Sequence, residues 1–161
     1  MQKIAAIIGM IILLCISTLE ASEQEQTSKK VVYNLTTGDI TRLENSLIGG
    51  IISHTTYYQS KLQELEVRVI IHGDAYKFFM KDLNNTAYAY QPNLVEKKPT
   101  LEKRLSSLAK QYNVTFFVCE IGAKHRKLKK KAFYPFVSMV HNAAIGLIDA
   151  QNDGFAYLDI K

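Results

Sequence analysis

The sequence predicts an α/β fold, a three-layer α/β/α domain around a mostly parallel five-stranded sheet. Short apolar segments alternate along the chain with stretches of helical periodicity, which is the pattern of successive βαβ units. The first three apolar segments are almost continuous, as expected for strands that are buried on both faces of a sheet. The 161 residues are enough for one domain with a substantial core and too few for two.

The N-terminus has the three-part layout of a cleavable signal peptide. Lys3 provides a short positive region, Ile4–Ile16 is an uninterrupted apolar run, and Ala21 is a small residue at the expected cleavage point. A permanent anchor is the alternative, but a spanning helix needs about 20 apolar residues and this run is shorter. Cys15 follows Leu14, where lipoprotein processing needs a small residue, so it is interpreted as part of the apolar run.

Three segments follow from this interpretation. We expect residues 1–21 to be removed as a signal peptide, so that the mature protein is periplasmic or secreted and keeps no stable membrane anchor. Residues 22–29 are polar and lack periodicity, and they are expected to form a flexible lead-in. Residues 30–161 then form a single α/β domain.

Strands and helices can be placed along this domain from hydrophobic spacing. Strands are expected over residues 31–35, 67–71, 114–119, 136–140 and 155–160. Helices are expected over residues 40–63, 74–80, 100–112, 121–133 and 143–151. The first helix contains Gly49 and Gly50, which would be explained by close packing on the sheet. Residues 82–99 carry two prolines and no periodicity, so they are expected to form a long loop of the kind that is often functional.

Candidate functional residues gather where the predicted strands end. Ligands of open α/β sheets bind at the carboxyl ends of the strands, and counting along the chain puts Asn34-Leu35, His72 and Cys119 at the ends of the first three. We identify Cys119 and His72 as candidate catalytic residues. Cys119 precedes a helical segment, and a helix start favours a thiolate. Lys124, Arg126 and Lys127 add positive charge, so we expect an accessible, reactive thiol and assign these three residues to anion binding.

The residues alone leave alternatives open. The one cysteine that remains after cleavage could fill the core, form an intermolecular bridge or act as a reactive group. His72 could accept the thiol proton, or it could be bonded to the backbone. We expect no metal site and no cofactor, because no motif or histidine spacing supports either. The net charge of +5 suits an anionic partner, but the basic segment lacks interleaved aromatic residues, so no nucleic-acid partner is expected.

Three segments carry a family resemblance. Residues 114–128 (VTFFVCEIGAKHRKL) resemble the cysteine segment of the DsrE/DsrF-like family of sulfur-relay proteins. Residues 69–73 (VIIHG) are similar to the family's second strand with its terminal His-Gly, and residues 142–158 resemble its last helix and strand. The resemblance covers roughly residues 30–160.

The resemblance implies a five-stranded α/β/α domain that assembles into homo-oligomers. It also implies that Cys119 carries sulfur as a persulfide, with a sulfur donor or acceptor protein, or a small sulfur anion, as partner. Tyr88 and Tyr90 of the predicted loop could pack against a neighbouring copy, or the loop could instead be a mobile lid over the site. The alternative is a non-catalytic oligomeric binding or scaffold protein in which Cys119 is buried, and thiol reactivity of the folded chain separates the two.

Overall fold

The computed structural model describes residues 28–84 and 86–161, so the predicted signal peptide lies outside the described residues. Most of the predicted lead-in also lies outside them, and its last residue, Lys29, already belongs to the first strand. The strands are β1 (Lys29–Leu35), β2 (Leu65–Ile71), β3 (Val114–Cys119), β4 (Val137–Val140) and β5 (Ala156–Ile160). They form one sheet in the order β4-β3-β2-β1-β5, and every neighbouring pair is parallel. The predicted three-layer α/β/α fold is therefore confirmed, with a fully parallel sheet.

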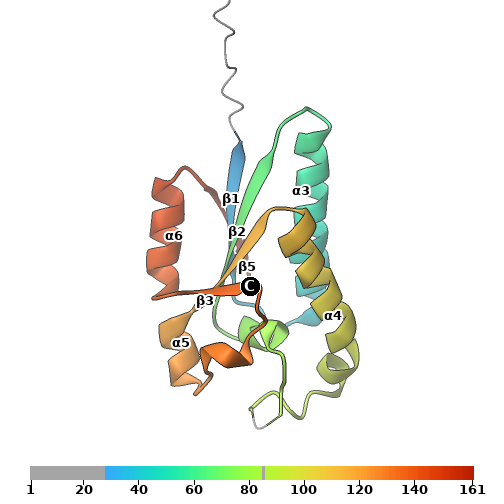
Figure 1. Cartoon of the computed structure of the whole chain (residues 1–161), viewed down its shortest axis with the longest axis vertical. Coiled ribbons are helices and arrows are strands. Elements are labelled where there is room, and N and C mark those ends of the chain that lie inside the picture. The colour runs from blue at the N-terminus through green and yellow to red at the C-terminus, as the bar shows by residue number, and fades with distance from the viewer. Residues whose placement is uncertain (1–27, 85) are drawn as a thin grey trace, which may run out of the picture.

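Helices cover both faces of this sheet (Figure 1). One continuous helical stretch follows β1 and consists of α2 (Ile40–Arg42), the π-helical segment η1 (Leu43–Gly49) and α3 (Gly50–Gln59). It begins at Asp39, whose carboxylate accepts a hydrogen bond from the Arg42 amide at 2.8 Å. Together with α4 (Pro92–Gln111) it covers one face, while α5 (Glu120–His125) and α6 (Ala143–Asn152) lie on the other side in Figure 1.

The glycine pair in the first helix does not mark a close approach to the sheet, contrary to the prediction. A Cβ atom at Gly50 would meet no heavy atom within 4 Å. A Cβ atom at Gly49 would meet only the Glu44 carbonyl oxygen, at 3.4 Å, which is ordinary van der Waals contact. The helix is held instead by Leu43, Leu47 and other fully buried aliphatic side chains on its inner face.

The predicted loop over residues 82–99 is wrong in its second half, because helix α4 spans Pro92–Gln111. Pro92 stands in the first turn, where the missing N–H has no helical partner in any case. Pro99 lies inside the helix and removes one backbone hydrogen bond. The helix tolerates this loss because one of its faces is buried along its length, through Leu94, Leu101, Leu105 and Leu108.

Two other predicted helices are shorter than expected. The segment after β2 is the 3-10 helix η2 (Ala75–Phe79), and the basic segment predicted over 121–133 is divided into α5 and the 3-10 helix η3 (Lys130–Ala132). The division occurs at Lys127, whose φ of 57° is left-handed and ends the helix. Among the described residues, no helix is both long enough and apolar enough to cross a membrane.

The inner strands are buried as the sequence predicts, but β5 is not. Val32, Val67, Val69, Phe116 and Val118 have no exposed surface, whereas the first four residues of β5 are all exposed. Among the described residues β5 pairs only with β1, so no described strand covers its other edge.

Candidate active site

Cys119 is the last residue of β3 and the N-cap of α5, as its position in the sequence predicts. Its backbone is still extended, with φ of −65° and ψ of 113°, so the chain turns from strand to helix immediately after it. The thiol is free, and only 6% of the residue is exposed. The expectation of an accessible thiol is therefore not met, because Cys119 is buried.

Tyr76 of η2 packs against this turn, and it was not among the predicted site residues. Its hydroxyl donates a hydrogen bond to the Cys119 carbonyl oxygen at 3.1 Å, and the residue is fully buried. Burial raises the pKa of Tyr76, and the neighbouring charge and hydrogen bond of the Cys119 side chain raise it further. Tyr76 therefore stays protonated and remains a hydrogen-bond donor at neutral pH.

Gly122 allows this close packing. A Cβ atom at this position would overlap the Tyr76 hydroxyl and would lie 3.7 Å from the Cys119 sulfur. The small residue after the cysteine thus lets the first turn of α5 lie directly against the buried ring. No local sequence pattern marks Tyr76, because it lies 43 positions before the cysteine that it contacts.

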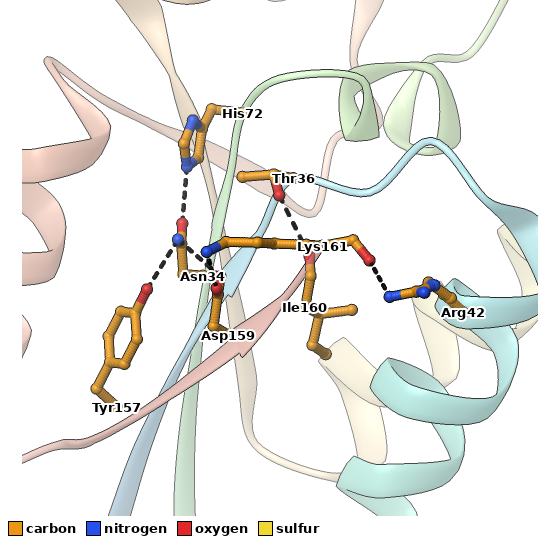
Figure 2. A network of polar contacts seen from close by, with 8 residues as sticks. All are labelled: Asn34, Thr36, Arg42, His72, Tyr157, Asp159, Ile160 and Lys161. Carbon is orange, nitrogen blue, oxygen red and sulfur yellow. Dashed lines mark hydrogen bonds and ion pairs between the residues drawn. The ribbon is translucent and has the colours of Figure 1, made fainter.

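His72 follows β2 and is held by a polar network at the carboxyl ends of β1 and β5 (Figure 2). Its Nε2 atom lies 2.7 Å from Asn34 Oδ1. The Asn34 amide nitrogen in turn donates to the Tyr157 hydroxyl at 2.9 Å and to Asp159 Oδ1 at 3.0 Å. Burial lowers the pKa of His72, and the charge of Asp159 opposes this effect without reversing it. His72 is therefore neutral at pH 7, and it is bonded to a side chain rather than to the backbone.

The sheet register places His72 beside Cys119. Ile71 pairs with Val118, so His72 and Cys119 are the next residues of two neighbouring strands, and such strands lie about 4.8 Å apart. The ladder on the other side continues through His72, whose amide donates to the Leu35 carbonyl oxygen at 3.0 Å. The two predicted catalytic residues thus lie next to each other at the carboxyl ends of β2 and β3.

The three predicted anion-binding residues are less favourably placed. Lys124 pairs with Glu120 at 2.8 Å, and Arg126 pairs with Asp74 at 3.1 Å. Lys127 is exposed at the end of α5. Two of the three positive charges are thus already compensated by carboxylates, which weakens their pull on an anion at Cys119.

A sizeable cavity lies away from Cys119. A cavity of about 530 Å³ opens between α3 and the amino ends of β1 and β5, and His54, Tyr58 and Leu158 contribute to its wall. Because this cavity lies at the amino ends of the strands, it is separate from Cys119, which lies at the carboxyl end of β3. Within residues 28–84 and 86–161, no three histidine, cysteine or acidic side chains gather into a site that could hold a metal ion.

Comparison with known proteins identifies the family, since the profile of the DsrE/DsrF-like family matches residues 30–160. The chain belongs to the DsrE/DsrF-like family. It is 31% identical over 90 residues to an uncharacterized protein of Aquifex aeolicus, an alignment that covers 56% of this chain and 38% of that protein. The structure is similar to that of MTH1491, a protein of unknown function from Methanobacterium thermoautotrophicum, with a TM-score of 0.62 and 16% identity. That similarity covers 82% of this chain and 99% of the other, and it supports the fold.

In this DsrE/DsrF-like chain, the neutral state of His72 makes stability depend on pH. The pKa of His72 is lowered on folding from its ordinary value of 6.5, so the unfolded chain binds a proton more readily below that pH. The contribution of His72 is complete above pH 6.5 and is lost progressively as pH falls towards the folded pKa. Denaturant midpoints at pH 7.5 and 5.5 should show a larger loss for the wild type than for His72→Gln. Equal losses in the two proteins would contradict this linkage.

Proposed function

We propose that this protein is a sulfur carrier that accepts sulfane sulfur on Cys119 as a persulfide and passes it to a partner thiol. The observation that carries the proposal is the placement of the free Cys119 thiol at the carboxyl end of an inner strand, beside His72 and at the start of a helix. Family membership supports it, since the DsrE/DsrF-like family is one of sulfur-relay proteins. The partner is a sulfur donor or acceptor protein, or a small sulfur anion such as thiosulfate.

The chemistry needs only one nucleophile and no cofactor. The Cys119 thiolate attacks the outer sulfur of a donor persulfide, the S–S bond of the donor breaks, and the donor leaves as a thiolate with the electron pair. The product is Cys119–S–SH. The reverse sequence, with an acceptor thiolate attacking the outer sulfur, unloads the protein. We place this exchange in the periplasm or outside the cell, in line with the N-terminal sequence.

Because Cys119 is buried, sulfur exchange requires a local movement that exposes its sulfur atom. With 6% of the residue exposed, a donor reaches the sulfur only if the first turn of α5 yields. This helix has six residues and, among them, only Ala123 is buried, so it has few apolar contacts to break. A small anion or a slender thiol-bearing segment suits such an opening better than a bulky substrate.

Sulfur loading of the folded protein tests the proposal. We expect incubation with an alkyl persulfide, followed by mass spectrometry of the cysteine peptide, to show an added mass of about 32 Da, which is one sulfur atom. Iodoacetamide should also modify native Cys119. Modification that occurs only after the protein has been denatured, with no loading in the native state, would identify Cys119 as core packing and overturn the sulfur-carrier function.

A second candidate function is an oligomeric binding or scaffold protein, and the burial of Cys119 favours it. Self-association is supported by the open edge of β5, where Tyr157 and Leu158 are 42% and 40% exposed. Such an edge presents unpaired backbone groups to a neighbour. The loop tyrosines contribute less than the sequence suggested, because Tyr88 is buried in its own chain and Arg126 donates a hydrogen bond to its hydroxyl. Tyr90 is 94% exposed.

Self-association can be tested at this edge. We expect light scattering at tens of micromolar protein, roughly ten times a micromolar dissociation constant, to show an oligomer for the wild type. Leu158→Lys should dissociate it, because a charge at an open strand edge opposes pairing with another strand. Val95→Lys is the matched control, since Val95 is an exposed aliphatic residue on α4. A monomeric wild type, or an oligomer that Leu158→Lys leaves intact, would contradict assembly through β5.

A further inference from the structure

We propose that Asn34 is a positioning residue that fixes the tautomer of His72 and so makes His72 Nδ1 the base for the Cys119 thiol. The inference deepens the proposed sulfur-carrier function and rests on it. It is based on the chain of hydrogen bonds that runs from Asp159 through Asn34 to His72 (Figure 2).

The chemistry of the groups determines where the protons lie. A carboxylate oxygen only accepts hydrogen bonds, so the Asn34 atom that faces Asp159 at 3.0 Å must be the amide nitrogen. The atom that faces His72 is then the amide oxygen, which also only accepts. His72 Nε2, at 2.7 Å from it, must therefore carry a hydrogen. In a neutral imidazole the other nitrogen, Nδ1, is left with a free lone pair.

Both His72 and Cys119 are on the α6 face of the sheet. Asn34 pairs with Ile70, and Cys119 pairs with Val140. Ile70 and Val140 lie against the same residue of α6, because a Cβ atom at Gly146 would be 3.2 Å from one and 3.0 Å from the other. Paired residues of neighbouring parallel strands point to the same face. His72, which is bonded to Asn34, and Cys119 therefore share this face at adjacent register positions.

His72 can act as a base only if its ring is neutral, and this depends on burial and on the charged groups around it. Asp159 on β5 is the charged group that acts on it, and Lys161 Nζ pairs with the same carboxylate at 2.8 Å. The Tyr157 hydroxyl on β5 joins the network by accepting a hydrogen bond from Asn34. Cys119 is the next residue after Val118, which pairs with Ile71 immediately before His72. Burial lowers the pKa of His72, which supports a neutral ring at pH 7.

The proton step is balanced without any added reagent. The S–H bond of Cys119 breaks and the proton moves to His72 Nδ1, which gives a thiolate and an imidazolium. The thiolate attacks the outer sulfur of the donor persulfide, and the donor departs as a thiolate. The imidazolium then returns its proton to that leaving group. The net change is the transfer of one sulfur atom from the donor to Cys119–SH, with His72 restored.

Nitrogen-15 NMR of the full folded chain tests the tautomer without any sulfur chemistry. We expect wild-type His72 to carry its hydrogen on Nε2. Asn34→Leu should shift population to the Nδ1–H form, while Asn34→Asp, which keeps an acceptor for Nε2–H, should preserve the Nε2–H form and raise the pKa of His72. His54, whose Nδ1 atom is 2.7 Å from the Tyr33 hydroxyl, is an internal control that should not change.

The rate of sulfur loading supplies the second measurement. We expect Asn34→Leu to slow loading by an alkyl persulfide by about 10-fold to 100-fold, as for residues that orient a reactive group, and Asn34→Asp to recover part of it. An Nδ1–H tautomer in the wild type, an unchanged tautomer in Asn34→Leu, or unchanged loading despite a changed tautomer would each overturn this inference while the sulfur-carrier function stands. A wild type that never loads sulfur would instead overturn the proposed function, whatever the NMR shows.

Discussion

Replacing Cys119 with serine is expected to abolish sulfur loading completely. No other cysteine lies among the described residues, and a hydroxyl cannot form a persulfide. The adduct of about 32 Da should disappear from the peptide that contains residue 119 at every donor concentration. Persistent loading of the serine variant would place the sulfur on another residue and contradict the role of Cys119.

The fold of this variant has to be verified, because Cys119 is buried. Serine places a hydroxyl where the thiol was, which costs roughly 1–3 kcal/mol if that group finds no partner. Cys119→Ala is the matched control, since it removes the nucleophile and adds no polar group. Both variants should retain the wild-type circular dichroism spectrum and a cooperative unfolding transition. If both folded variants fail to load sulfur, the loss results from the missing thiol and not from unfolding.

The fold was accessible from the sequence because buried parallel strands leave a strong local signal. Val114–Cys119 is predicted with both ends correct, since its apolar run is bounded by Asn113 and by the start of a helix. The apolar runs of the second and third strands also showed where each strand ends, which placed His72 and Cys119 at the carboxyl ends of the sheet. Strand register is a property of the whole sheet and was not predicted, and the structure supplies it, for example in the pairing of Ile71 with Val118.

The rest of the site could not be predicted because it depends on contacts between distant segments. Asn34 and Asp159 are 125 positions apart and meet only because β5 pairs with β1. Tyr76 reaches Cys119 across 43 positions. The first part of helix α4, residues 92–99, was missed for the opposite reason, since Pro99 argues locally against a helix while the burial of Leu94 on the inner face of α4 argues for one. Tertiary packing outweighs the local preference.

Gly122→Ala is expected to be among the most destabilising single substitutions near the site. The added methyl group would overlap the hydroxyl of Tyr76, whose ring is fully buried and packs on Phe133 with centroids 6.2 Å apart. Overpacking of this kind typically costs about 1–3 kcal/mol, which exceeds the gain of roughly 1 kcal/mol that alanine brings to a helix. The free energy of unfolding in urea measures the difference.

A double-mutant cycle with Tyr76→Phe identifies the cause. The phenylalanine variant alone loses the hydrogen bond to the Cys119 carbonyl oxygen, which costs about 1 kcal/mol, but it also removes the atom with which the methyl group collides. In that background the nearest atom to the added methyl group is the ring Cζ, at 3.3 Å, so Gly122→Ala should cost much less and the two substitutions should be coupled by more than about 1 kcal/mol. Gly50→Ala serves as the matched control, because a methyl group there meets no atom within 4 Å and should stabilise the helix. Additive effects of Gly122→Ala and Tyr76→Phe would show that the tyrosine hydroxyl does not determine the requirement for glycine beside the thiol.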